Sequence, residues 1–506
     1  MGSDLTKSVV RGGAWIGTSQ IFHQVLRFVA MTILARLLFP DDFGVIAMAT
    51  VITSAGLNLG NMGFNQALIQ RKEVTPGHFS TTFWTALAIG IILCVITVAI
   101  SPLVAIFFNN ALVGPILAVL SLTFIIDSLG SVHVAILTKK LEFSKLAIAR
   151  IGGGIVYLTI AAITALTGFG VWSIVIAELS SVAATVVLLW VVSRWHPSFV
   201  YSIQCLKDLW KFGLNLTGAR LVASLHMRLD YLIIGRFLTP ASAGFYYLAY
   251  RTIGMPRERL EAMVTSVTFP AFSIIQDENE QLRRGFLKSV ALVSIIVFPL
   301  YAGLAIIAPE LVKLFFGDKW IMSITPIQVL CIWACVRNLT APNDPVFMSK
   351  GRADIALKTI IIDLIILVPC LLIAVTQGIT GVAIAMSSVA GIMWVVRQAI
   401  TNRLIGLKIR DYIVTMRPAV FGTIVMSTFL FTFRYVATRL LTMPDVALLI
   451  SCVLLAVSVY FITLKALKTQ VLDEIVSLII DMVRSYARAI IIKIPMHTKK
   501  NPRIVD

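Results

Sequence analysis

Charged residues are scarce in this chain. Asp, Glu, Lys and Arg make up 13% of its 506 residues, whereas soluble globular proteins carry about 25%. Hydrophobic residues account for 58% of the sequence, and the mean hydropathy is +0.91. This composition excludes a soluble fold and predicts an all-α integral membrane protein.

Clusters of metal ligands and recognisable catalytic motifs are also missing. The six cysteines have no metal-ligand spacing, and most lie in apolar runs as small hydrophobic residues. No metal motif, nucleotide-binding loop or nucleophile–base pattern occurs, so we expect neither an enzyme nor a metal or cofactor site. The first apolar run is too long for a signal peptide and lacks a small-residue cleavage site, so we expect it to be retained.

Long apolar segments make up most of the sequence. A spanning helix needs about 20 mainly apolar residues, and about 14 segments satisfy this requirement. Residues 471–493 alternate apolar and charged residues at helical spacing, which is typical of an amphipathic helix lying on the membrane surface. The predicted spans are 13–38, 43–69, 79–107, 114–137, 146–167, 171–193, 210–238, 243–274, 286–316, 322–347, 355–376, 379–401, 414–437 and 443–465.

Lysine and arginine are distributed unequally between the two sides of the predicted spans. With the N-terminus in the cytoplasm, the inner segments hold 30 basic residues and the outer segments hold 6. Basic residues are enriched in cytoplasmic loops of membrane proteins, so we expect both termini to be cytoplasmic. The same bias explains most of the net charge of +18, and no nucleic-acid partner is needed to account for it.

The chain repeats itself after about 200 residues. "ARLLFPDDFG" (35–44) reappears as "GRFLTPASAG" (235–244), and an even number of spans separates them, so both copies have one orientation. Proline, glycine and the acidic residues of this turn suit a helix start, a structural role. The predicted units are two parallel six-helix bundles (1–200 and 207–405), an extra helix pair (406–466) and an amphipathic tail (467–506).

Seven basic residues remain after those assigned to the two sides, and all seven are arginines inside predicted spans. An arginine at the bilayer centre costs at least about 2.5–3.5 kcal/mol, so these side chains should face the bundle interior or a hydrated cavity. Arg257 and Glu261 can pair at i, i+4 as a structural ion pair. The others concentrate in spans 1, 7 and 8, which predicts a cationic cavity for a phosphorylated ligand. The seven are Arg27, Arg220, Arg228, Arg251, Arg257, Arg259 and Arg337, with Arg27, Arg228 and Arg251 favoured.

Five further titratable residues are candidates for lining this cavity or for coupling transport to a proton or sodium gradient. Each has the alternative of being a buried, hydrogen-bonded group with no role in transport. They are His23, Asp127, Glu178, Asp230 and Asp363.

Several longer motifs carry a resemblance to a known family. "LARLLFPDDFGVIAMA" (34–49), "GFNQALIQRKEVT" (63–75), "RLDYLIIGRFLTPASAGFYYLAYR" (228–251) and "VTFPAFSIIQ" (267–276) resemble polysaccharide flippases of the multidrug/oligosaccharidyl-lipid/polysaccharide exporter superfamily, most closely the colanic-acid-type lipopolysaccharide biosynthesis transporters. The resemblance spans about residues 5–440.

The resemblance implies a V-shaped pair of bundles with a central cavity and alternating access. It implies transport of undecaprenyl-pyrophosphate-linked oligosaccharide across the bacterial inner membrane, with polysaccharide polymerase or assembly proteins as partners. In the related peptidoglycan-precursor flippases an extra helix pair forms a lipid-tail groove. The site arginines come from the burial argument and not from the resemblance.

Two other functions remain open at this point. A cation-coupled multidrug exporter would share the fold, but it should line its cavity with acidic residues for cationic drugs. A membrane glycan polymerase or ligase would be an enzyme acting on the same lipid carrier. Such an enzyme should carry residues in a substantial outer loop, whereas the predicted outer loops are short, "FNNALVG" and "TGFG" among them.

Overall fold

A computed structural model describes residues 2–60, 63–71, 74–207, 224, 226–439 and 443–467, with side chains from Gly17 onward except Thr18. Within this part the chain is helical with short connections and contains no strand. Arg220 and the predicted tail beyond Leu467 lie outside the described residues.

The helices follow one another closely along the chain. In the first half they are α1 (Gly2–Leu37), α2 (Pro40–Gly60), α3 (Phe64–Gln70), α4 (Pro76–Phe107), α5 (Val113–Leu120), α6 (Leu122–Lys139), α7 (Phe143–Leu166) and α8 (Trp172–Ser193). In the second half they are α10 (Leu229–Phe237), α11 (Pro240–Ile274), α12 (Asn279–Leu311), α13 (Ile324–Thr340), α14 (Asn343–Ser349), α15 (Ala353–Ala374), α16 (Gly378–Ile405), α17 (Ile409–Arg439) and α18 (Asp445–Ala466).

These helices coincide with the predicted spans, and the chain is a multi-pass membrane protein. Ten helical stretches of the described chain are long and apolar enough to cross a membrane, and α15 and α16 are counted there as one stretch. The stretches leave out α1, α10 and α11, which belong to the three predicted spans where most of the seven arginines lie. Of span 210–238 the structure describes little more than α10, so the count of 14 stays a prediction.

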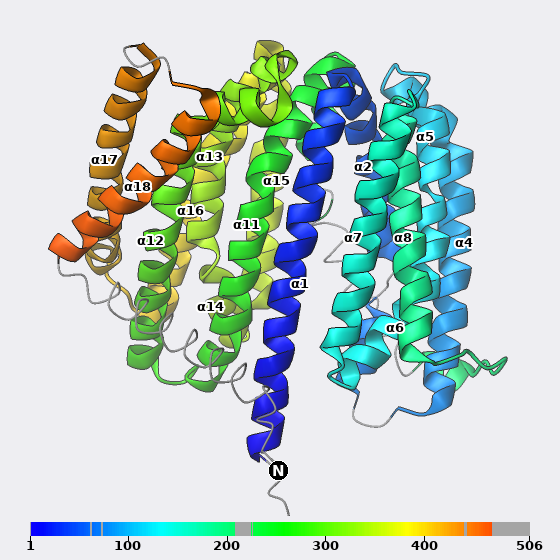
Figure 1. Cartoon of the computed structure of the whole chain (residues 1–506). Helices are drawn as coiled ribbons and strands as arrows, with labels where there is room; N and C mark the ends of the chain where they lie inside the picture. Colours follow the sequence, from blue (N-terminus) through cyan, green and yellow to red (C-terminus); the bar gives the residue numbers. More distant parts are fainter. Residues whose placement is uncertain are drawn as a thin grey trace, which may run out of the picture.

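The helices form two bundles with an added pair. α1 packs on α7, α7 on α8 and α8 on α6, while α11, α12 and α16 gather around α13. α17 and α18 pack on each other and on α12, at the outer edge of the second bundle (Figure 1). This arrangement confirms the predicted fold class.

The two bundles cross where the repeated motif lies. α2 and α11 both begin at the repeated proline, and they pack against each other. A Cβ atom on Gly44 would lie 2.7 Å from the carbonyl carbon of Pro240, and one on Gly244 would lie 2.6 Å from that of Pro40. The contact is reciprocal, as a two-fold relation between the repeats requires. The turn residues thus have the predicted structural role, and the glycines add a close helix approach.

Further contacts join the bundles at the end of the molecule where α1 ends. The indole Nε1–H of Trp320 donates to the Ala35 carbonyl at 2.8 Å, and Arg236 Nη1 donates to the Phe107 carbonyl at 3.0 Å. The ring of Phe43 lies edge-on to Trp320, with 5.0 Å between centroids. The bundles meet at this end and separate toward the end where α1 begins (Figure 1). We call the first end the closed end and the second the open end.

Candidate functional site

A cavity of about 380 Å³ lies between the two bundles, below the closed end. The first bundle contributes side chains of α1, α2 and α8, and the second contributes Arg228 and side chains of α10 and α11. Its charged lining residues are Arg27, Asp127, Glu178, Arg228, Arg251 and Glu258, and four tyrosines complete the polar wall: Tyr157, Tyr231, Tyr247 and Tyr250. We call this space the upper cavity.

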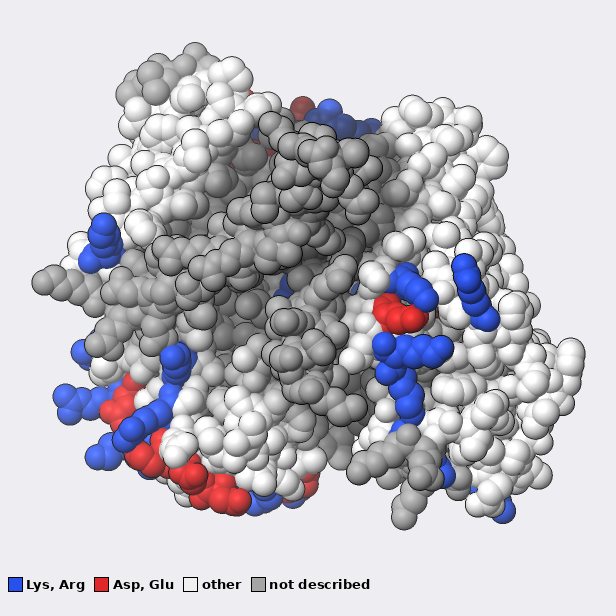
Figure 2. Space-filling view, turned by 60° about the horizontal axis from the view of Figure 1, so that its bottom comes forward, with Lys and Arg blue, Asp and Glu red and all other residues white. Residues whose placement is uncertain are grey.

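A second cavity of about 490 Å³ continues toward the open end. It shares His23, Arg27 and Asp127 with the upper cavity, so the two form one continuous path. Arg150 and Arg259 add positive charge to this lower cavity, and polar side chains of α1 and α3 line it as well. Figure 2 turns the open end toward the viewer and shows basic side chains on both bundles.

Arg27 is held by an acidic partner from another helix. Its Nη1 donates to Glu178 Oε2 at 2.7 Å, and its Nη2 lies 3.4 Å from Glu178 Oε1. The guanidinium also stacks on the Tyr157 ring, 3.9 Å from the centroid. Because the charge of Arg27 is largely neutralised, this residue organises the cavity wall more than it adds net charge.

Arg228 and Arg251 differ from Arg27 in this respect. Both line the upper cavity, and among the described residues no carboxylate lies within ion-pair distance of either guanidinium. Arg228 is the residue before α10, and its guanidinium lies 5.5 Å from the centroid of the Tyr231 ring. These two arginines are therefore not held in close ion pairs by the described part of the chain, although Asp127 and Glu258 line the same cavity.

Two arginines shape the lower cavity. Arg259 donates to the side-chain oxygens of Gln20 at 3.1 Å and Gln24 at 3.4 Å, so amide groups hold it without removing its charge. Arg150 was counted among the 30 basic residues of the inner side and was not predicted to belong to the site. α7 begins at Phe143, so Arg150 lies two turns inside this helix. The glycines that follow Arg150 favour close helix packing, and they are the sequence feature that could have indicated its position inside the bundle.

The remaining predicted arginines lie away from this path. Arg257 is 1% exposed, is paired with Glu261 and stacks over Trp333 at 5.0 Å, in agreement with a structural ion pair. Arg337 lies in the second bundle, with Nη1 3.7 Å from Asp363 Oδ2. The structure does not bring these two together with the cavity arginines.

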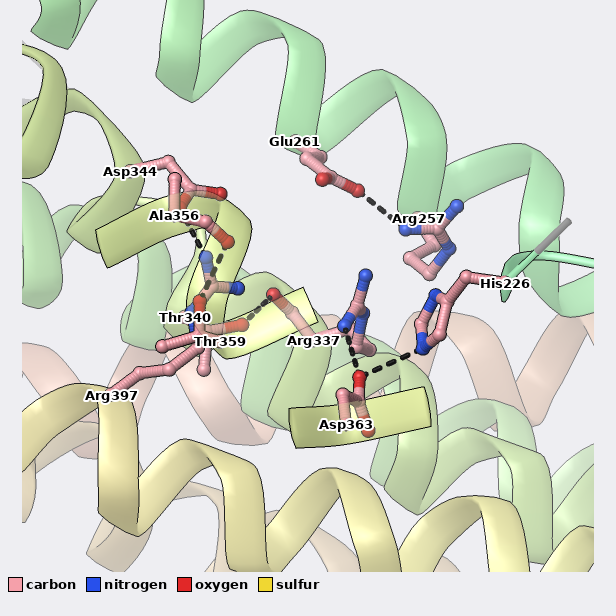
Figure 3. Close-up of polar contacts among 10 residues, drawn as sticks. All are labelled: His226, Arg257, Glu261, Arg337, Thr340, Asp344, Ala356, Thr359, Asp363 and Arg397. Atoms are coloured by element: carbon pink, nitrogen blue, oxygen red, sulfur yellow. Dashed lines mark hydrogen bonds and ion pairs between the residues drawn. The ribbon is translucent and has the colours of Figure 1, made fainter. Parts of the chain in front are cut away.

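The acidic candidates and His23 are also divided between two environments. His23, Asp127 and Glu178 line the cavities. Asp230 is 1% exposed and accepts hydrogen bonds from the Tyr246 hydroxyl at 2.9 Å and from a backbone N–H at 2.8 Å. It therefore fits the alternative of a buried, hydrogen-bonded acid. Asp363 lies beside Arg337 and His226 (Figure 3), outside the central path.

Comparison with known proteins finds a matching family model, related sequences and a solved structure with a similar fold. A family model described as "Polysaccharide biosynthesis protein" matches residues 33–325. The teichuronic acid biosynthesis protein TuaB of Bacillus subtilis is 30% identical over 85% of this chain and 87% of its own length. The lipopolysaccharide biosynthesis protein WzxC of Escherichia coli is 28% identical over 81% and 85%. A solved structure of the lipid II flippase MurJ, in an inward closed conformation, has a TM-score of 0.72 at 14% identity, covering 90% of this chain and 98% of that one.

Proposed function

This chain belongs to the polysaccharide biosynthesis protein family, and on that premise we propose that it is a flippase for lipid-linked, anionic oligosaccharides. The lipid carrier is undecaprenyl pyrophosphate, and the membrane is the bacterial inner membrane. The head group enters the cavities between the bundles, while the polyprenyl tail stays in the lipid. The two relatives are named for the biosynthesis of teichuronic acid and of lipopolysaccharide, which supports this substrate class.

The proposal rests mainly on Arg228 and Arg251, two cavity arginines that form no ion pair with a carboxylate among the described residues. A cationic residue at membrane depth is costly unless a ligand or water compensates it. The planar guanidinium matches the oxygens of phosphate and pyrophosphate in a two-pronged geometry. A cation-binding multidrug exporter would place carboxylates where these arginines lie.

The open end faces the cytoplasm in this proposal, because the excess of basic residues marks that side and places both termini there. The cavities are then loaded from the leaflet on which lipid-linked units are assembled. Release on the other side requires the closed end to open, with α2 and α11 separating, and the open end to close. The product then reaches polymerase or assembly proteins outside the membrane.

The two arginines can be tested in a strain that lacks this gene. Arg228→Ala or Arg251→Ala removes a charge-assisted contact worth about 1.5–3 kcal/mol, so translocation should fall about 10- to 150-fold. Lys at either position should retain part of the activity. The measurement is the amount of polyprenyl-linked repeat unit in each leaflet, with protein level followed in parallel.

A matched control is Arg284→Ala, whose side chain is 77% exposed outside the cavities. It should transport as the unchanged protein does. Accumulation of the lipid-linked unit on the cytoplasmic leaflet supports the flippase. If both alanine variants transport normally at normal protein levels, the cavity arginines have no part in substrate binding. A unit that is translocated but not polymerised would indicate a polymerase instead.

A further inference from the structure

The segment that leaves the first bundle lies on the outer surface of this bundle, near the open end. α8 ends at Ser193, and residues 194–207, which we call the linker, lead on toward the second half of the chain. Residues 194–202 form no helix, whereas residues 203–207 are helical. In Figure 1 the linker projects sideways past the start of α4. The described lining of the two cavities contains no residue of the linker, so it lies outside the substrate path.

Hydrogen bonds fasten the linker to α4 at two points. The backbone N–H of Ser198 donates to Ser80 Oγ at 3.1 Å, and the indole N–H of Trp84 donates to the Ser198 carbonyl at 2.9 Å. The backbone N–H of Ser202 donates to Thr81 Oγ1 at 3.1 Å. The stretch between Ser198 and Ser202 is therefore held against the first bundle at both of its ends.

Aromatic packing fixes the linker on the side that precedes this stretch. The Trp195 ring lies edge-on to Phe83, with 6.1 Å between the centroids, and edge-on to His133, with 5.3 Å. His133 is fully buried in the first bundle. Since both packing and hydrogen bonds hold the linker, the outward direction of the side chains that follow is set by the fold.

Large apolar side chains point outward between the two fastening points and just beyond them. Phe199 is 94% exposed, Val200 and Tyr201 are each 53% exposed, and Ile203 is 64% exposed. The Phe199 ring stacks on Trp84, with 5.3 Å between the centroids and 24° between the planes. Neighbouring exposed apolar side chains of this kind mark a contact surface rather than a surface that faces water.

The backbone of the linker decides at what depth this surface lies. Irregular backbone that faces lipid does not occur within the hydrocarbon region, because its N–H and C=O groups need hydrogen-bond partners. The boundary between head groups and acyl chains suits both the polar backbone and the apolar side chains, and Trp and Tyr are enriched there. The linker is fastened close to the start of α4, a membrane span that begins at Pro76, which is where this boundary is expected.

The neighbouring surface and the charges of the linker indicate what covers it. Farther along α4, Ile91, Ile92 and Val95 are exposed, so the apolar surface of the linker continues the surface that faces lipid. The linker carries Arg194 and Lys207, both exposed, and its sequence contains no Asp or Glu. Basic residues near a membrane surface attract anionic head groups. Lipid is thus a better match than a protein partner for this surface.

We propose that the linker is an interfacial anchor that binds anionic phospholipids in the leaflet at the open end. The apolar side chains of Phe199, Val200 and Ile203 lie among the upper parts of the acyl chains, and Arg194 and Lys207 contact the phosphates of the head groups. Because the linker is fastened to α4, the anchor fixes the depth of the first bundle in the membrane. This inference is independent of the substrate that the chain carries.

The depth of the linker can be measured with a genetically encoded spin label at Val200 in the full chain, in nanodiscs that contain phosphatidylglycerol and phosphatidylcholine. Collisions with oxygen, which concentrates among acyl chains, are compared with collisions with a water-soluble nickel chelate. At Val200 oxygen should collide more often. The control is the same label at Asp277, an exposed residue in the turn between α11 and α12 at the open end, where the nickel chelate should collide more often. Phe199→Ser should make the Val200 label more accessible to nickel.

The lipid preference is measured by the line broadening that a nitroxide-bearing phospholipid causes in the Val200 label. Phosphatidylglycerol should be enriched over phosphatidylcholine beside the label by about fivefold for each basic residue, equivalent to about 1 kcal/mol. The Arg194→Asn/Lys207→Gln double variant should lose this enrichment, and asparagine suits the positive φ of 53° at position 194. Arg284→Gln, a change on the second bundle, should retain it.

Two results would overturn the anchor. Equal access of the nickel chelate to the labels at Val200 and Asp277 would place the linker in water and leave its apolar surface for a protein partner. Equal broadening by the two lipids in the unchanged chain, or enrichment that survives in the double variant, would show that the basic residues do not bind anionic lipid. Transport is not measured in either experiment, so failure of the proposed function would not alter these results.

Discussion

The crossing of α2 and α11 has no room for a side chain at two equivalent glycines. A Cβ atom on Gly44 or Gly244 would come closer than 3.0 Å to the backbone of the opposite proline, a distance that real Cβ atoms essentially never show. The obstacle is backbone and cannot move aside as a flexible side chain could. Alanine at either position must therefore push the two helices apart at the closed end.

The expected size of this effect follows from overpacking. Forcing an extra methyl group into a packed contact typically costs about 1–3 kcal/mol. The cost falls on the state in which the helices cross closely, and a state in which the closed end has opened avoids it. Gly44→Ala should therefore shift the equilibrium toward the opposite state by about 5- to 150-fold. Since one separation of the helices relieves both clashes, the Gly44→Ala/Gly244→Ala double variant should shift the equilibrium by less than the sum of the single effects.

The assay is the distance between genetically encoded spin labels at Leu112 and Phe237, which are 52% and 58% exposed at the closed end, measured on the full chain in lipid nanodiscs. Gly391→Ala is the control, because Gly391 is also helical and a Cβ there meets nothing within 4 Å. It should leave the distribution unchanged. A folded Gly44→Ala protein with the same distance distribution as the unchanged protein would refute the idea that this crossing closes one end of the carrier.

Three further substitutions test contacts between helices. Glu178→Gln leaves Arg27 without its carboxylate and should lower the free energy of unfolding by about 1–3 kcal/mol, measured by denaturation in detergent, while Glu178→Asp should lose less. Trp320→Phe removes a hydrogen bond across the closed end, worth about 1 kcal/mol, and should increase the long-distance population of the labels. Glu310→Gln breaks the 2.7 Å ion pair with Arg434 that joins α17 to α12, and should raise proteolysis of the extra helix pair without changing the label distances.

The membrane spans were predictable because burial in lipid leaves a long apolar run in the sequence. α4, α7, α8 and α16 begin or end within a few residues of their predicted limits. The breaks within spans were not predicted, for example between α5 and α6, where Ser121 separates two short helices. Hydropathy does not record such a break, because the chain remains apolar across it.

The side-chain partners were harder to predict than the helices. His226 and Asp230 are four residues apart, which on a continuous helix would place them on one face. The structure has a turn at residues 227 and 228, so His226 meets Asp363 on α15 instead, while Asp230 is satisfied by Tyr246. Helical spacing predicts partners only while the helix continues, and the partner here lies more than a hundred residues away.

That turn also shows where the two repeats differ. α1 continues without interruption from Gly2 to Leu37, whereas the described part of its counterpart has a turn at residues 227 and 228, directly before α10. A closed end needs symmetry, because Gly44 and Gly244 must each leave space for the other repeat's backbone. The segment before α10 is not symmetric in this way, because Arg228 lines the upper cavity while His226 lies beside Asp363 inside the second bundle. The unbroken copy holds Arg27 against Glu178 and stays with the first bundle, and the interrupted copy carries Arg228 and His226 into separate pockets. The duplicated chain therefore combines a symmetric contact at the closed end with a turn in only one of the two copies, and this turn places Arg228 in the wall of the upper cavity.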